Sequence, residues 1–113
     1  MEEIRLATPA DAPSLAPLFA AYRAFFTGRT NLRESRDFLA ERLAKAQSVV
    51  ALAEQDGAVR GFAQLYPLFS SWYAKRIWFL SDLYVSEPAR GKGLAKRIIG
   101  HVKPSRMKPA RVA

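Results

Sequence analysis

The residues whose types and spacing most clearly suggest chemistry are Arg90-Gly91-Lys92-Gly93, between a run that predicts a strand and one that predicts a helix. Glycines let a backbone come close to phosphate oxygens, and N–H groups at the start of a helix point toward a bound anion. The segment therefore predicts an anion site, to which its two cationic side chains add charge. The loop alone leaves an alternative open, a tight turn with solvated cations, because short glycine motifs recur by chance.

Several other classes of site are excluded. The loop lacks the Gly-x-x-x-x-Gly-Lys-Ser/Thr of a P-loop, and no Gly-x-Gly-x-x-Gly follows the first predicted strand. The chain has no cysteine, which excludes a disulfide scaffold, a thiol nucleophile and a thiolate metal site. Because His101 is the single histidine, no metal site is predicted.

The formal net charge of +8 is placed unevenly along the chain. Residues 1–89 carry equal numbers of basic and acidic side chains, and the whole excess lies in residues 90–113. This asymmetry indicates an anionic partner for that end, a basic tail, or both. Nucleic acid is not the expected partner, because residues 86–113 contain no aromatic ring except that of His101 on which a base could stack.

The elements that must position the loop can be read from the 113 residues, a length that suits one domain with a single core. Hydrophobic periodicity distinguishes helices from strands. The expected elements, in chain order, are a strand over 3–7, a helix with its apolar face over 15–26, a helix over 32–46, strands over 48–54, 59–69 and 76–85, and a helix beginning at about 94.

Local signals refine these expectations. Thr8 and Asp11 form a predicted capping box, and Asp56-Gly57 predicts a type I′ hairpin turn. Pro67 should bend or end its strand. The strand 76–85 is apolar on both faces, which is typical of a central strand covered on both sides. The expected buried face of the last helix consists of Leu94, Ala95, Ile98, Ile99 and Val102.

At this point the chain resembles a known family. The run Leu83-Tyr84-Val85, a short acidic-proline turn and then Arg90-Gly91-Lys92-Gly93-Leu94-Ala95 resembles the acetyl-coenzyme A signature of the GNAT N-acetyltransferases. That signature has the form Arg/Gln-x-x-Gly-x-Gly/Ala, and Arg90, Gly93 and Ala95 occupy its three fixed places. The expected element order β-α-α-β-β-β-α is also that of the family as far as its third helix.

The resemblance implies an α+β (mixed α/β) fold with a mixed, mostly antiparallel sheet flanked by helices. It also implies that an amine attacks the thioester of the co-substrate acetyl-coenzyme A directly. The pyrophosphate would rest on amides at the start of the last helix. The pantetheine arm would pair with the end of the preceding strand, where an amide polarises the thioester carbonyl. The implied coenzyme-binding residues are Leu83, Tyr84, Val85, Arg90, Gly91, Lys92, Gly93, Leu94 and Ala95.

Asp82 is the candidate catalytic residue. The acceptor amine arrives as an ammonium ion, so a base is needed, and Asp82 is the one carboxylate inside an otherwise apolar strand. The commoner role for such a residue is a structural hydrogen bond, to the backbone or to Ser81 or Tyr84, and the residues alone favour that role. For Lys96 and Arg97 the sequence leaves two roles open: contact with a phosphate group of the coenzyme, or exposure to solvent without a partner.

The acceptor is expected to be an amine-bearing small molecule or protein. Three tyrosines could line its pocket, although aromatics at these spacings more often belong to a core. They are Tyr22, Tyr66 and Tyr73. In this family the acceptor enters near the connection of the first two helices, here residues 27–31. The start Met-Glu-Glu does not resemble a targeting segment, so a cytoplasmic protein without membrane contact is expected.

The resemblance ends at about Val102. Family members continue with a further β-α-β-β unit, which walls the pantetheine slot and usually supplies a tyrosine that protonates the leaving thiolate. No tyrosine follows Tyr84 here. We therefore expect residues 1–102 to form an incomplete, C-terminally truncated domain and residues 103–113 a basic irregular tail. The alternative to an active enzyme is a non-catalytic remnant or coenzyme-binding module, open to dimerisation through its exposed sheet edge.

Overall fold

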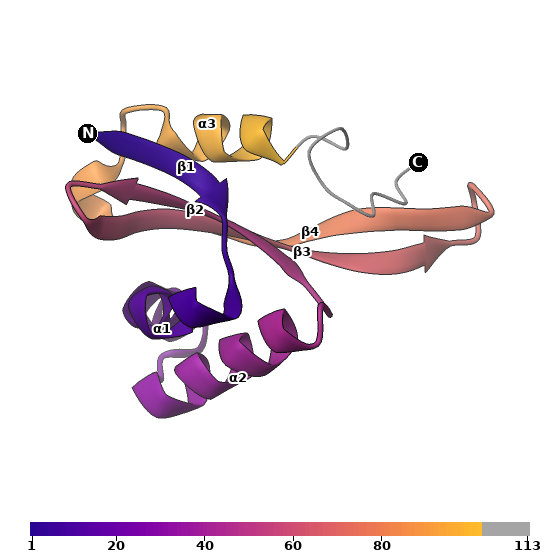
Figure 1. The fold of residues 1–113 in the computed structure, drawn as a ribbon, viewed down its shortest axis with the longest axis horizontal. Coiled ribbons are helices and arrows are strands. Elements are labelled where there is room, and N and C mark those ends of the chain that lie inside the picture. Colours follow the sequence, from indigo (N-terminus) through magenta and orange to yellow (C-terminus); the bar gives the residue numbers. More distant parts are fainter. Residues whose placement is uncertain (103–113) are drawn as a thin grey trace.

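A four-stranded antiparallel sheet forms the centre of the computed structural model, which describes residues 1–102 (Figure 1). Its strands lie in the order β1 (Glu2–Leu6), β2 (Val49–Gln55), β3 (Ala58–Ser70) and β4 (Lys75–Val85). Helices α1 (Ala12–Thr27) and α2 (Leu32–Ala44) cover one face, and α3 (Leu94–His101) covers the other. This confirms the α+β class and the predicted element order. The predicted tail, residues 103–113, lies outside the described residues.

The alternation of side chains along β2 divides the core between the two faces of the sheet. Val50 and Leu52 pack with Leu15 and Phe19 of α1, while Ala51 and Ala53 pack toward α3. All of these side chains are buried. Within residues 1–102, no helix is both long enough and apolar enough to cross a membrane.

The Asp56-Gly57 turn forms as its sequence predicts, with φ of 53° and 82° at its two central residues. The strand does not end at Pro67, one of the two outcomes that the sequence predicts, because β3 continues through Pro67 to Ser70. Pro67 lies beyond the last residue of β3 that pairs with β2, Leu65. There, within residues 1–102, β3 has a neighbouring strand on one side only, and such a position tolerates a residue that cannot donate a hydrogen bond.

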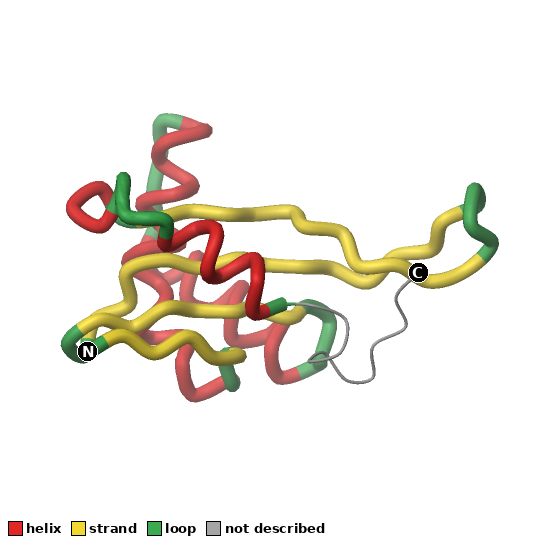
Figure 2. Tube along the Cα trace, turned by 90° about the horizontal axis from the view of Figure 1, so that it is seen from above, coloured by secondary structure: helices red, strands yellow, loops and turns green. Residues whose placement is uncertain are grey.

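The prediction that residues 76–85 form a covered central strand is also wrong for the described part of the chain. There β4 is the outermost strand, and Phe79 and Leu80 are 51% and 39% exposed. Both views show the β3–β4 hairpin reaching well past the other two strands (Figure 1, Figure 2). Of the face expected to be buried at the last helix, Leu94, Ile98 and Val102 are buried, Ala95 is half-buried and Ile99 is 41% exposed.

Gly61 fixes how closely α3 approaches the sheet. A Cβ atom at this position would lie 2.9 Å from Ile98 Cδ1 and 3.3 Å from the carbonyl oxygen of Tyr84. Gly61→Val is therefore expected to lower the free energy of unfolding by about 1–3 kcal/mol through overpacking. Denaturant unfolding checks this, with Gly100→Ala as control, because no atom lies within 4 Å of a Cβ at Gly100. Equal stability of the two variants would contradict the prediction.

An ion pair connects β1 to the turn that precedes α1. Both terminal nitrogens of Arg5 donate to the Asp11 carboxylate, at 2.9 and 2.8 Å, and the backbone N–H of Thr8 donates to it at 2.7 Å. The hydrogen bonds from Arg5, the largest cause, lower the pKa of Asp11 from 3.8 to about 2. The predicted capping interaction between Thr8 and Asp11 is thus present.

A lowered folded-state pKa predicts that Asp11 contributes stability above pH 4, which is lost as the pH falls from about 4 to about 2. The contribution amounts to about 2 kcal/mol. Urea unfolding of the wild type and of Asp11→Asn should differ by this amount at pH 6 and converge near pH 2. A difference that does not change with pH would contradict the assignment.

Candidate functional site

The glycine loop between β4 and α3 adopts a left-handed backbone that favours glycine at two positions. The chain leaves β4, makes a short 3-10 turn, η2 (Glu87–Ala89), and passes through Gly91 and Gly93 with φ of 82° and 77°. Residues with a side chain pay about 1–2 kcal/mol for this left-handed conformation. The loop is therefore shaped by its glycines, and it places the start of α3 beside the end of β4.

The start of α3 presents unpaired backbone donors. Arg97 donates the first backbone hydrogen bond of the helix, 3.1 Å to the carbonyl oxygen of Gly93. The N–H groups of Leu94, Ala95 and Lys96 precede that bond, so they have no partner within the helix and point out of its N-terminus. A pocket of about 210 Å³ opens here. We call it the loop pocket, and its lining residues are Val85, Ala89, Arg90, Gly91, Gly93, Leu94 and Ala95. This geometry suits an anion.

The pocket gathers six of the nine residues implied for coenzyme binding, and Leu83, Tyr84 and Lys92 do not line it. The Arg90 side chain folds back along β4. Its Nε donates to the carbonyl oxygen of Val85 at 2.8 Å, and its guanidinium lies 5.2 Å from the centre of the Tyr84 ring. Arg90 therefore joins the loop to the end of β4.

The sequence left open whether Lys96 and Arg97 contact phosphate, and the structure places these two cations differently. Arg97 donates to both carboxylate oxygens of Glu2 at 2.9 Å and to the carbonyl oxygen of Lys92 at 2.7 Å. The hydrogen bonds with Arg97 lower the pKa of Glu2. Arg97 thus connects the glycine loop, at Lys92, to β1, at Glu2. Lys96, in the first turn of the same helix, is exposed.

A second pocket, of about 350 Å³, lies between α1, α2 and the β3–β4 pair on the opposite face of the sheet. We call it the Asp82 pocket, and its lining residues are Phe19, Tyr22, Arg23, Glu34, Phe38, Tyr66, Ser81 and Asp82. Gln64 pairs with Asp82 and the next β3 residue, Leu65, pairs with Leu80, so Ser81 is an extra residue of β4. This bulge interrupts the alternation of side chains, and both Ser81 and Asp82 line the pocket.

Asp82 is held by two hydrogen bonds from neighbouring elements. Tyr22 Oη donates to one carboxylate oxygen at 2.6 Å, and Gln64 Nε2 donates to the other at 3.0 Å. Ser48 Oγ in turn donates to Gln64 Oε1 at 2.8 Å, and both Ser48 and Gln64 are buried. Asp82 thus accepts hydrogen bonds from side chains of α1 and β3, and not from Ser81 or Tyr84, the side chains that the structural alternative named.

Burial, followed by the hydrogen bond to Asp82, raises the pKa of Tyr22 to about 12. Burial also raises the pKa of Tyr66. Both hydroxyls therefore stay protonated at neutral pH, and Tyr22 remains a donor to Asp82. Of the three tyrosines considered for an acceptor pocket, Tyr22 and Tyr66 line it, while Tyr73 lies exposed near the tip of the β3–β4 hairpin.

The sequence analysis missed the two polar residues behind Asp82, Ser48 and Gln64. Gln64 has a detectable signal, because it is a lone polar residue between Ala63 and Leu65 in an apolar stretch. Its pairing with Asp82 follows only from the register of β3 against β4. Asp82 and Val85 lie three residues apart on β4, so the Asp82 pocket and the loop pocket are about 10 Å apart along the strand.

A family model described as the acetyltransferase (GNAT) family matches residues 15–108. The chain is 44% identical over 100 residues to the uncharacterized N-acetyltransferase YhfO of Bacillus subtilis, and the match covers 88% of this chain and 67% of that protein. The chain thus spans about two thirds of the length of this relative.

Solved structures show the same fold. The crystal structure of a probable acetyltransferase superimposes with a TM-score of 0.80 at 42% identity, covering 88% of this chain and 67% of the other. A predicted acetyltransferase from Clostridium acetobutylicum, solved with acetyl-CoA, has a TM-score of 0.71 at 18% identity and covers 89% and 70%. The match of the family model over most of the chain, together with a relative at 44% identity, shows that this protein belongs to the GNAT family of acetyltransferases.

Proposed function

We propose that the chain binds acetyl-coenzyme A along β4 and transfers its acetyl group to an amine in the Asp82 pocket. The loop pocket at the start of α3 is the observation that carries this proposal. Its unpaired N–H groups and two left-handed glycines suit a pyrophosphate. The pantetheine arm then follows the outer edge of β4 past Leu83, Tyr84 and Val85, and no strand within residues 1–102 pairs with that edge.

The proposed transfer is a direct displacement. The ammonium ion of the acceptor gives a proton to Asp82, and the resulting amine attacks the carbonyl carbon of the thioester. A C–N bond forms, the C–S bond breaks, and the leaving thiolate takes up the second proton, which the nitrogen loses as the amide forms. Asp82 lines the pocket with its carboxylate held by Tyr22 and Gln64, so its orientation toward an acceptor costs little further entropy.

Two findings support the proposal. The relative at 44% identity is named an N-acetyltransferase, and a structure of the same fold was solved with acetyl-CoA. The residues at the three fixed places of the family signature also line one pocket, and Asp82 lies three residues from Val85 at its edge. The acceptor class is the part of the function that fold alone does not determine.

The test measures release of coenzyme A thiol from acetyl-coenzyme A with a panel of amines: amino acids, polyamines and a lysine-containing peptide. Amine-dependent release together with an acetylated product by mass spectrometry is the expected result. Binding of the coenzyme without transfer to any amine would favour the alternative, a non-catalytic coenzyme-binding module. Absence of coenzyme binding would contradict both.

A further inference from the structure

Two buried polar side chains, Ser48 and Gln64, lie behind the Asp82 pocket. Ser48 is 5% exposed and Gln64 is 0% exposed, and neither lines the Asp82 pocket or the loop pocket. A polar group that is taken out of water costs free energy unless a hydrogen bond compensates it, so such a pair calls for an explanation. Its place in the sheet supplies one.

The sheet brings the pair to Asp82 in one row across three strands. Gln64 of β3 pairs with Val50 of β2 on one side and with Asp82 of β4 on the other. Ser48 precedes Val50 by two residues, which places it diagonally opposite Gln64. Ser48 Oγ donates to Gln64 Oε1 at 2.8 Å, and Gln64 Nε2 donates to Asp82 Oδ2 at 3.0 Å. Ser48 is therefore connected to Asp82 through the Gln64 amide.

The Gln64 amide has a donor end and an acceptor end, and they act on Asp82 in opposite ways. An ionised carboxylate only accepts hydrogen bonds, so the NH₂ end stabilises it and the oxygen end repels it. With the NH₂ end on Asp82, the amide oxygen points back toward β2 and needs a donor, which Ser48 supplies. Without the Ser48 hydroxyl, this orientation would leave a buried amide oxygen unpaired, which is costly.

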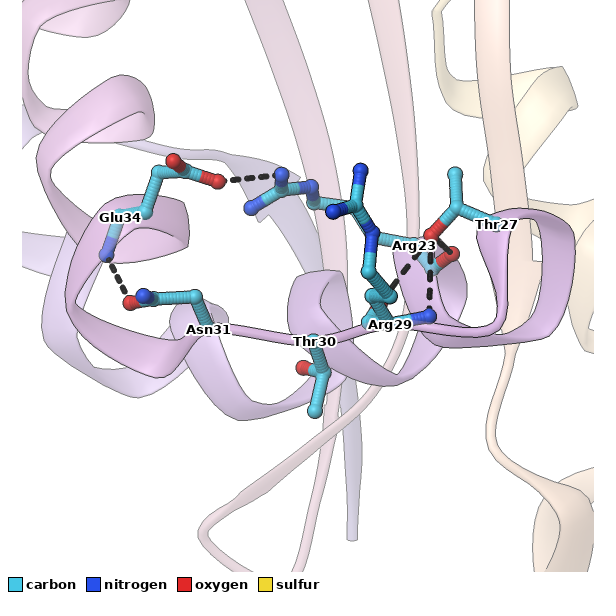
Figure 3. Close-up of a pocket in the computed structure, with 6 residues that line it drawn as sticks. All are labelled: Arg23, Thr27, Arg29, Thr30, Asn31 and Glu34. Carbon is cyan, nitrogen blue, oxygen red and sulfur yellow. Dashed lines mark hydrogen bonds and ion pairs between the residues drawn. The ribbon is translucent and has the colours of Figure 1, made fainter.

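The other titratable groups that line the Asp82 pocket do not replace this contact. Tyr22 of α1 donates to the other carboxylate oxygen, Oδ1. Arg23 of α1 and Glu34 of α2 line the pocket, but they pair with each other (Figure 3). Tyr66 of β3 also lines the pocket, as a protonated hydroxyl. Among the residues that the structure describes, the side chain that donates to Oδ2 of Asp82 is Gln64.

We propose that Ser48 and Gln64 are positioning residues: Ser48 fixes the Gln64 amide with its NH₂ end toward Asp82, and this contact keeps the carboxylate ionised and oriented toward the acceptor. The inference rests on the proposed function, since it concerns how Asp82 acts as the base. Tyr22 and Gln64 each occupy one lone pair of a carboxylate oxygen, which leaves the others for the ammonium ion. Ser48 and Gln64 themselves take up no proton.

A double-mutant cycle tests whether Ser48 acts through Gln64. The value of kcat/KM for one amine is measured in the wild type, Ser48→Ala, Gln64→Leu and the double variant. Ser48→Ala is expected to lower it by about threefold to tenfold, and Gln64→Leu by about tenfold or more. The double variant should be no slower than Gln64→Leu, because the effect of Ser48 passes through the amide that is already lost.

The double variant also guards against misfolding, because removing both polar partners leaves no buried group unpaired between them. If the two single effects multiply in the double variant, Ser48 does not act through Gln64 and the inference is overturned. A folded Ser48→Ala variant with the kcat/KM of the wild type would overturn it as well.

The pH profile separates positioning from a loss of stability. A hydrogen bond to a carboxylate favours its charged form, so both single variants should shift the acidic limb of kcat/KM to higher pH, by about one unit in Gln64→Leu. The same amine is used throughout, so its own ionisation is common to all profiles. An acidic limb that stays in place in Gln64→Leu would contradict the inference.

The matched control is Ser35→Ala. It removes the hydroxyl of another buried serine, which accepts a hydrogen bond from Arg23 at 2.9 Å and lines neither the Asp82 pocket nor the loop pocket. Ser35→Ala should lower stability but keep the acidic limb of the wild type. An equal shift in this control would show that the shift reports stability and not the position of Asp82.

Failure of the inference can be distinguished from failure of the proposed function. In the ¹⁵N-labelled chain, Asp82→Asn and Ser48→Ala should each move upfield the signal of the Gln64 side-chain N–H that faces Asp82. If an amine is acetylated but Ser48→Ala leaves this signal and the acidic limb unchanged, the inference fails and the acetyltransferase function stands. If no amine is acetylated, the proposed function fails, and the signal still decides whether Ser48 holds the amide against Asp82.

Discussion

Gly93→Asp is expected to weaken the binding of acetyl-coenzyme A by about 100-fold, which corresponds to about 3 kcal/mol. Gly93 precedes α3 with φ of 77°, and a Cβ atom there would lie 3.3 Å from the Arg97 guanidinium. The new carboxylate would lie at the helix N-terminus, where it would compete with the pyrophosphate for the N–H groups of α3. Isothermal titration measures the change in dissociation constant.

The matched control is Gly57→Asp. Gly57 also has a left-handed backbone, with φ of 82°, but it lies in the β2–β3 turn and does not line the loop pocket. Both variants place a side chain on a left-handed backbone and add one negative charge, so the control shows what these two changes do by themselves. Only Gly93→Asp should lose affinity for the coenzyme. If a folded Gly93→Asp variant binds within threefold of the wild type, the pyrophosphate does not lie at this loop.

The second large effect is expected from Asp82→Asn, which should lower kcat/KM for the acceptor by about 10²- to 10⁴-fold, the range for loss of a general base. The asparagine amide cannot take a proton from the ammonium ion. It also has one acceptor oxygen where Tyr22 and Gln64 both donate. The deficit should narrow as the pH rises toward the pKa of the amine, because the acceptor then arrives deprotonated.

Two controls separate the base from the network that holds it. Tyr22→Phe removes one hydrogen bond to Asp82 but keeps the carboxylate, so it should reduce kcat/KM by about tenfold or less. Gln64→Leu should lower stability, because it leaves the buried Ser48 hydroxyl without its acceptor. A folded Asp82→Asn variant with wild-type kcat/KM would show that Asp82 is structural only.

Local signals determined much of the fold from the sequence. The Asp56-Gly57 turn, the interaction of Thr8 with Asp11 and the start of α3 after Gly93 depend on neighbouring residues, and all three occur as predicted. The loop pocket also draws all of its lining residues from one short segment, residues 85–95, so sequence alone could bring them together. The expectation that failed in this region concerned Ile99, whose exposure depends on how much of α3 the sheet covers.

The Asp82 pocket could not be assembled from the sequence, because its parts come from distant positions. Tyr22 and Asp82 are 60 residues apart in the sequence. They meet only because α1 packs against the β3–β4 pair. The Ser81 bulge depends on the register between two strands, which alternation alone does not reveal. The apolar sequence of β4 predicted burial, whereas no strand of residues 1–102 covers its outer edge.

The central claim is that acetyl-coenzyme A binds along the end of β4 and the start of α3. A titration of the ¹⁵N-labelled chain with acetyl-coenzyme A, followed by amide NMR, tests it most directly. The largest shifts are expected at the amides of Gly91–Ala95, with a second group at Leu83, Tyr84 and Val85. No shifts, or shifts confined to residues outside these two segments, would contradict the claim.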